Sequence, residues 1–490
     1  MKNVLMFVAL AFVYLAAISV HSSYAAIFFF DERIAVDGYI QNQTSYRTSS
    51  GNHEFVSSEN MLQVEMSAEI SANLMLIGTY RGIYDAIYDL RHDSDRWSRL
   101  YSGSRDSLCI ESKMREYYAD VTLGVVDLRI GKQQVVWGES DGLRLMDIIN
   151  PLDMRRQYIT RNWEDIRIGQ HMVKAVYEIN PLYNSFLELV WNPGDIERDK
   201  IYADTTMSDR HKSPWTISNS LALESLVPLR TMGLVDMPED SASDWSFSNS
   251  EVGGRIAGDL GGWFVTLNYW YGFSKTAVLE GDLTTLEPFF LGTGPLPPLP
   301  VHLTYRYPRE NVIGFTFNKC TGMWVWRGEF ATYLDKHYNK TEMGLLMPNI
   351  KIAKKVQQAS MLGFDYKRLI TWLNPEKMFF ISGQVFHYHI FNHDDELEFG
   401  PYSQTAREDS FALSLLVNTG YDMERICPEV MVVYDSGTTG WYIKSFVELK
   451  YGDHWRPQLG ALLFYGDPYE LPFGEMHKKD EIYLRVKYQF

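Results

Sequence analysis

Many runs of about ten residues place an apolar side chain at every second position, and this pattern limits the folds open to the chain. The stretches GGWFVTLNYWYG (261–272) and YLRVKYQF (483–490) both alternate in this way, the second to its last residue. Because successive side chains of a strand point to opposite faces, one face must meet an apolar environment and the other water. Strands of soluble sheets are mostly about 5–6 residues long, so longer runs that end in aromatics favour a transmembrane barrel.

The spacing of these runs predicts an all-β fold, a transmembrane antiparallel β-barrel of about 18 strands (16–18). Every second connection is short and the others are long, as in outer-membrane barrels with periplasmic turns and extracellular loops. The predicted strands are residues 36–48, 60–71, 74–86, 113–124, 127–137, 170–179, 184–193, 250–259, 263–273, 310–320, 323–334, 358–368, 376–390, 408–418, 428–434, 441–451, 456–465 and 480–490.

The N-terminus indicates export. An uncharged apolar run follows Lys2 and ends in the small residues that precede a cleavage point at Ala26. This is the pattern of a secretory signal peptide. We therefore expect a signal peptide at residues 1–25, a barrel at 26–490 and a location in the cell outer membrane.

Residues 113–134 predict one hairpin in detail. A tight turn at Val125 and Val126 would pair Thr122 with Arg129 and place Asp120 diagonal to Arg129. The polar side chains would then share the face toward the lumen. The residues expected to face the lumen are Glu116, Asp120, Arg129, Gln133, Trp270, Lys444 and Glu448, with the aromatics Phe264, Phe446 and Phe464 among them.

The connection at residues 138–169 is long enough to need a role of its own. We expect it to fold into the barrel, narrow the lumen and carry a short helix in residues 151–158. Asn150 would cap that helix and Pro151 would occupy its first position. The predicted constriction consists of Asp141, Arg144, Asp147, Asp153, Arg155 and Arg156.

The composition argues against several classes of function. A formal net charge of −16 disfavours nucleic acid as a partner, because such binding needs a basic footprint. Cys109, Cys320 and Cys427 are too few and too scattered for a disulfide framework or a zinc site. No G-x-S-x-G or H-E-x-x-H motif and no phosphate-binding glycine loop occurs. We therefore predict no enzymatic activity, no catalytic residues and no cofactor.

The stretch HYHIFNHDD (387–395) leaves two interpretations open. His387 and His389 share a strand face, with further histidine and aspartate just beyond, so the group could bind a metal. Alternatively, it is an aromatic girdle strand that enters a wet loop. We favour the second interpretation and predict no metal site.

The segment 129–158 also resembles a known family. A strand ending in WGESDG precedes a D-x-x-NP-x-D stretch formed by Asp147, Asn150, Pro151 and Asp153. The order resembles Gram-negative outer-membrane proteins described only by a domain of unknown function. Relatives are often encoded beside RND-type exporters and periplasmic lipid-binding proteins. The resemblance thus implies transport of lipid-like molecules, with a periplasmic carrier or RND-type exporter as candidate partner.

Together these features predict an outer-membrane channel that passes a small hydrophobic or amphipathic solute. The alternative is a diffusion porin for hydrophilic solutes, constricted by the 138–169 loop. Further expected partners are outer-membrane lipid, lipopolysaccharide and the barrel-assembly machinery, the last through the C-terminal strand that ends at Phe490.

Overall fold

The computed structural model describes residues 27–29, 33–49, 53–91, 105–157, 159–200, 214–215, 226–240, 245–400, 404–468, 470 and 473–490. The expected signal peptide lies outside these residues. In the part of the chain that is described, no helix has the length and apolar character to cross a bilayer. The α-helices are α2 (Ile87–Leu90), α4 (Arg105–Leu108), α5 (Trp163–Ile166), α7 (Val227–Thr231) and α8 (Glu287–Phe290).

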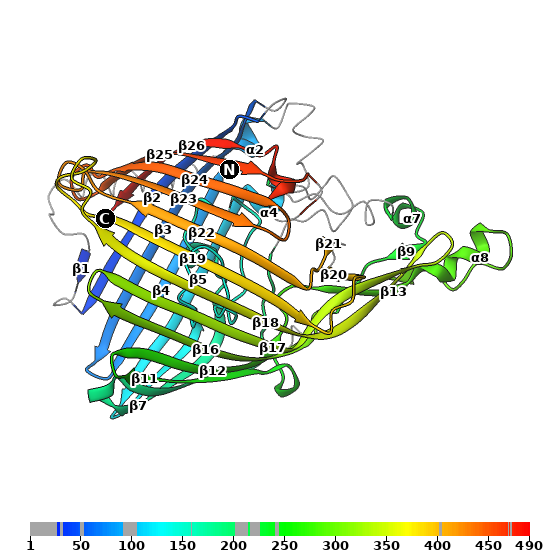
Figure 1. Cartoon of the computed structure of the whole chain (residues 1–490), viewed down its shortest axis with the longest axis horizontal. Helices are drawn as coiled ribbons and strands as arrows, with labels where there is room; N and C mark the ends of the chain where they lie inside the picture. Colours follow the sequence, from blue (N-terminus) through cyan, green and yellow to red (C-terminus); the bar gives the residue numbers. More distant parts are fainter. Residues whose placement is uncertain are drawn as a thin grey trace.

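Antiparallel strands form a closed barrel, since β2 (Ile34–Arg47) pairs both with β3 (Glu54–Ser71) and with the last strand, β26 (Glu481–Gln489). The strands run diagonally across the barrel in Figure 1. This confirms the predicted fold class and the count of eighteen. In order around the wall, the strands are β2 (Ile34–Arg47), β3 (Glu54–Ser71), β4 (Leu74–Asp85), β5 (Ile110–Leu123), β6 (Val126–Gln133), β7 (Gln170–Asn180), β8 (Ser185–Asn192), β11 (Glu251–Leu260), β12 (Trp263–Phe273), β16 (Arg309–Thr321), β17 (Trp324–Met343), β18 (Pro348–Arg368), β19 (Phe379–Phe391), β22 (Asp409–Asn418), β23 (Ile426–Asp435), β24 (Gly440–Leu449), β25 (Trp455–Tyr465) and β26 (Glu481–Gln489).

The turn between β5 and β6 corrects one predicted register. Asp120 lies directly opposite Arg129, and Thr122 lies opposite Asp127 rather than Arg129. The turn therefore sits at Gly124 and Val125, one residue earlier than expected. Gly124 has φ +65°, a left-handed conformation that glycine adopts without steric cost, so the chain turns there.

The hairpin of β17 and β18 corrects a predicted loop. The sequence predicts a long connection at residues 335–357, but strand pairing continues to Met343 and resumes at Pro348. The register shifts between Tyr333 and Lys336, and beyond that point charged residues such as Lys340 enter the strands. Outside the membrane both faces of a hairpin can meet water, so the apolar alternation ends while the backbone pairing persists.

This hairpin forms part of an arm that projects from the end of the barrel that carries the long loops (Figure 1). The arm also contains α7, α8, β9 (Val235–Asp236) and β13 (Val278–Asp282). A separate apolar cluster that includes Leu283, Leu286 and Leu303 holds the arm together. The remaining short strands are β1 (Ile27–Phe29), β9 (Val235–Asp236), β10 (Glu239–Asp240), β13 (Val278–Asp282), β14 (Val301–His302), β15 (Thr304–Arg306), β20 (Leu397–Phe399) and β21 (Gln404–Thr405).

The outer face of the barrel is apolar. Leu267, Leu459 and Leu484 expose 55%, 59% and 51% of their surface on three different strands. Aromatic side chains gather near the strand ends, for example Trp324, which stacks on Tyr366 with ring centroids 4.1 Å apart. A closed barrel with an apolar belt between aromatic girdles is the architecture of an outer-membrane protein, which confirms the expected location.

Candidate functional site

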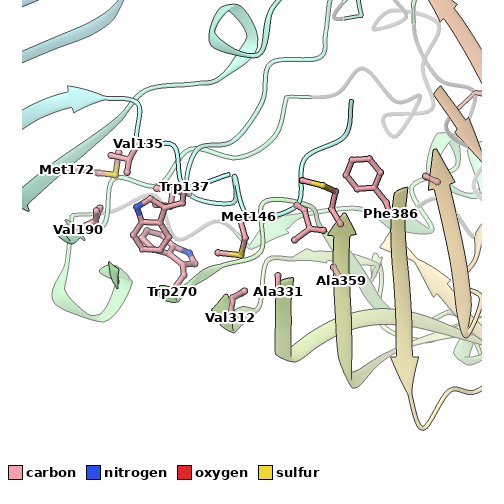
Figure 2. Packing of buried hydrophobic residues seen from close by; sticks show 14 residues of the cluster. Val135, Trp137, Met146, Met172, Val190, Trp270, Val312, Ala331, Ala359 and Phe386 are labelled. Atoms are coloured by element: carbon pink, nitrogen blue, oxygen red, sulfur yellow. The ribbon is translucent and has the colours of Figure 1, made fainter. Parts of the chain in front are cut away.

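The connection between β6 and β7 (residues 134–169), here called the internal loop, lies inside the barrel. Met146 and Ile149 are 1% and 0% exposed and belong to the apolar cluster lining the inner wall. Figure 2 shows Met146 directed toward Val312 and Ala331 of that wall. The wall is shaped for this contact, because a Cβ added to Gly314 would lie 2.3 Å from the Met146 methyl group. The inward-folded loop is therefore a packed element of the structure.

Asn150 fastens the base of the internal loop. Its side-chain oxygen accepts from the backbone N–H of Val135 at 2.7 Å, and its amide donates to the carbonyl oxygens of Gln133 and Ile168 at 3.3 and 2.8 Å. These bonds tie the start of the loop to its end. Asn150 therefore does not cap a helix, and the predicted helix at 151–158 is wrong for the residues described. The short helix of the loop is α5, at Trp163–Ile166.

Glu329 of β17 holds the middle of the loop. Its side chain is fully buried, and its carboxylate accepts hydrogen bonds from the backbone N–H groups of Glu139 and Met146, the latter at 3.0 Å. Nearby, Trp137 packs edge-on against Trp270 with centroids 6.0 Å apart and donates to Glu188 at 2.6 Å. Figure 2 shows the two indoles face to edge. The loop is thus fixed to several strands of the wall.

The six predicted constriction residues divide among separate ion-pair groups instead of forming one cluster. Asp147 pairs with Arg144 at 3.1 Å and with Arg167 at 2.7 Å. Asp141 reaches the opposite wall, where it pairs with Arg327 of β17 at 2.5 Å. The loop therefore spans the lumen through charges as well as through apolar contacts.

The other three predicted residues face β3 and β5. Asp153 pairs with Arg155 at 2.6 Å, and Arg155 also reaches Glu111 of β5 at 2.9 Å. Burial alone would raise the pKa of Asp153, but the hydrogen bonds and charge of Arg155 outweigh it and lower the pKa below its ordinary value. Arg156 pairs with Glu59 of β3 at 3.4 Å.

Sequence reasoning missed the wall residues that receive the loop. Glu59, Glu111, Arg327 and Glu329 all face inward, yet none was singled out. The alternation of side chains along β3 could have identified Glu59 as facing inward, because Glu59 lies on the same strand face as Gln63. For Glu329 no signal was available, because its partners are backbone groups of a loop whose path the sequence does not specify.

All seven residues expected to face the lumen lie on the inner face. Strand register places Glu116, Asp120, Arg129 and Gln133 there on β5 and β6, Trp270 on β12, and Lys444 and Glu448 on β24. The Arg129 guanidinium donates to both Asp120 carboxylate oxygens at 2.7 and 2.8 Å. Charged groups thus line the lumen beside aromatic side chains.

The first two histidines of the stretch 387–395 lie on the outer face. His387 and His389 of β19 both contact the same carboxylate oxygen of Asp409, at 2.7 and 3.0 Å. Their strand neighbours Phe386 and Ile390 are buried on the inner side. Within the described ranges, no group of three or more His, Cys, Asp or Glu side chains is arranged to hold a metal ion.

Two cavities lie at opposite ends of the barrel, with the internal loop between them. The extracellular cavity has a volume of about 290 Å³ and is lined by Trp270, Lys275, Tyr333 and the loop residues Arg144 and Leu145, among others. The periplasmic cavity is larger, about 720 Å³. Its lining includes the apolar residues Leu369, Met378, Phe380, Pro428 and Phe446 and the charged residues Lys367, Lys377, Lys450, Glu429 and Glu448.

Comparisons with known proteins give one family model and several solved structures. A family model described as "Protein of unknown function (DUF1302)" matches residues 6–490. No curated protein sequence matches the chain. Among solved structures, Pseudomonas aeruginosa OccK2 (OpdF) aligns over 95% of this chain and 99% of its own, with 8% identity and a TM-score of 0.49. Acinetobacter baumannii OccAB3 aligns over 93% and 99% (10% identity, TM-score 0.47), and Salmonella typhi OmpF over 95% and 100% (9% identity, TM-score 0.43).

Proposed function

We propose that this chain, which belongs to the DUF1302 family of proteins of unknown function, is an outer-membrane channel that passes a small hydrophobic or amphipathic, lipid-like solute. The observation that carries the proposal is the periplasmic cavity, in which apolar and charged side chains alternate. Phe380 and Phe446 face the same space as Lys367 and Glu448. Sites that bind amphipathic molecules combine apolar walls with a few oriented polar groups.

The internal loop supplies selection in this proposal. It packs on the wall through Met146, bonds to Glu329 and pairs with Arg327 through Asp141. A solute moving between the two cavities must pass the loop. A narrow passage with fixed charges suits a slow, selective channel better than an open aqueous pore.

The same proposal assigns the partners. A periplasmic carrier or RND-type exporter would exchange the solute at the periplasmic cavity, which opens among the short turns near Gly420 and Glu424. Outer-membrane lipid and lipopolysaccharide would surround the apolar belt. The barrel-assembly machinery would recognise the last strand, in which Phe490 exchanges backbone hydrogen bonds with Gly38 at 3.0 and 3.1 Å.

Flux measurements test the proposal. The purified full chain is reconstituted into liposomes, and entry of a fluorescent medium-chain amphiphile is compared with entry of a sugar of similar mass. We expect the amphiphile to enter faster than in empty liposomes and the sugar to stay excluded. Sugar entry together with a large, steady and weakly selective conductance in planar bilayers would instead identify a diffusion porin. A matched control is the heat-denatured chain in the same liposomes.

A further inference from the structure

The barrel wall is interrupted on the extracellular side of β6. Strand β5 pairs with β6 only from Tyr117 to Leu123. Strand β6 ends at Gln133, which lies opposite Gln170, the first residue of β7. In the part of the chain that is described, residues 110–116 of β5 therefore have a strand partner only on the β4 side. A free strand edge is not tolerated in hydrocarbon, so this gap must be covered or must border a polar space.

Side-chain contacts cover the gap in place of a backbone ladder. The Arg115 guanidinium donates to the carbonyl oxygens of Glu164 and Arg167, the second at 3.2 Å. The Gln134 side chain donates to the Glu116 carboxylate at 3.1 Å. These contacts join the base of the internal loop to β5 without a backbone ladder, so opening the gap does not require breaking the pairing of β5 with β4.

The gap begins at the level of the outer aromatic girdle. Tyr117, the last β5 residue paired with β6, contacts His171 on the outer face at 2.5 Å. The His171 ring lies 5.4 Å from the ring of Trp245. Aromatic side chains on the outside of a barrel mark the headgroup region of the bilayer. The gap is therefore beside the headgroups of the outer leaflet.

A cavity of about 60 Å³ lies at the gap, and its lining includes residues from both faces of the wall. Met114, which is 42% exposed on the outer face, and Lys132 lie at one end, while Arg81 and Arg161 lie toward the lumen. The lining is rich in positive charge. Its cations are Arg81, Lys113, Arg115, Lys132, Arg156, Arg161, Arg167 and Lys200, and its acids are Glu111, Asp153, Asp165 and Glu197.

Two of these cations have no acidic partner. Most of the lining is paired, for example Arg81 with Asp165 at 2.5 Å. Arg115 is only 7% exposed and Lys132 is half-buried, yet neither forms an ion pair with a carboxylate of the described residues. A buried charge is costly unless it is compensated. The Arg115 guanidinium donates to two backbone carbonyls, with Asp165 and Glu116 among the charges nearby, so it can still take an anion as a direct ion-pair partner.

We propose that this gap is a lateral portal, where the anionic headgroup of a single-chain amphiphile passes between the barrel interior and the outer leaflet. The inference rests on the proposed function and deepens it, since it names the substrate class and the exit. Arg115 and Lys132 bind the carboxylate, phosphate or sulfate, and the acyl chain lies along Met114 on the apolar outer face.

Binding by the full chain in a neutral detergent tests the headgroup site. The probes are dodecyl phosphate, inorganic phosphate and dodecanol, and the variants are Arg115→Gln and Lys132→Gln. The matched control is Lys319→Gln, an outward lysine over the Trp263 ring, near the turns at the other end of the barrel. We expect dodecyl phosphate to bind tightest and each variant to weaken it about tenfold or more, the effect of losing one charge-assisted hydrogen bond. Unchanged affinity in both variants, or equal binding of inorganic phosphate, overturns the proposal.

Photocrosslinking tests the route. A photoreactive phenylalanine replaces Met114 or, as control, Leu413, which is 46% exposed on the outer face of β22, away from the gap. During flux we expect dodecyl phosphate to crosslink at position 114 and not at 413. If wild-type flux proceeds with equal labelling at both positions, the portal is wrong and the channel stands. If the wild-type chain gives no amphiphile flux at all, the proposed function itself fails, and the portal with it.

Discussion

The carboxylate of Glu329, on the inner wall of the barrel, accepts a hydrogen bond from the backbone N–H of Met146 at 3.0 Å, and so links β17 to the middle of the internal loop. The same carboxylate accepts from the N–H of Glu139. One wall residue thus holds two separate positions of the internal loop, in a part of the loop that has no helix or strand. The position of the loop depends on such contacts more than on its own conformational preference.

Replacing Glu329 with glutamine should loosen the loop. An amide presents one acceptor oxygen where the carboxylate presents two, so one buried N–H loses its partner, at a cost of about 1–3 kcal/mol. We expect more frequent opening events and a higher mean conductance in planar bilayers. The matched control is Asp259→Asn, an inward carboxylate on β11 that makes no hydrogen bond to the loop in the described structure. Identical recordings from both variants would show that Glu329 does not hold the loop.

The contact of Met146 with Gly314 allows a double-mutant test. A Cβ at position 314 would lie 2.3 Å from the Met146 methyl group, so Gly314→Ala should force the Met146 side chain out of its packed position. Met146→Ala should lower stability by about 2–5 kcal/mol through the cavity it leaves. The double variant should be more stable than the sum of the single effects predicts, because the smaller side chain relieves the clash. Thermal unfolding followed by gel mobility measures this, and strict additivity would contradict the contact.

The pair of Asp120 and Arg129 should tune ion selectivity with little effect on stability. Both side chains are more than a quarter exposed, and pairs of this kind contribute about 0–1 kcal/mol. Asp120→Asn leaves a net positive charge in the lumen and Arg129→Gln a net negative one. The reversal potential under a salt gradient should therefore move in opposite directions for the two variants. A shift of the same sign in both would mean that the pair does not face the conducting path.

The fold could be predicted from the sequence because lipid imposes a strict rule. Every barrel strand must alternate between apolar side chains that face lipid and side chains that face the lumen. Residues such as Leu267 and Leu484 follow this pattern whatever the structure of the loops. Where lipid is absent, prediction failed. Beyond Tyr333 the strands continue without apolar alternation. The local sequence suggests that Asn150 caps a helix, but its amide donates to a backbone carbonyl at the end of the internal loop.

The sequence was enough to locate the candidate site, but not to predict which wall residues contact the internal loop. The length and charge of residues 138–169 indicated an inward loop, and Asp141 and Asp147 do lie inside the barrel. Their partners could not be found, because Arg327 is 186 residues from Asp141 in the chain. Which strand faces a loop across a lumen depends on the closure of the whole barrel. Local pattern does not contain that information.

Removal of residues 141–157 tests most directly whether the internal loop narrows the barrel. The matched control removes residues 288–299 at the tip of the extracellular arm, far from the barrel interior (Figure 1). Single-channel conductance is recorded for the full chain and for both deletions under the same salt conditions. We predict a conductance several-fold higher for the 141–157 deletion and an unchanged value for the control. Equal conductance in all three proteins would mean that the internal loop does not narrow the barrel.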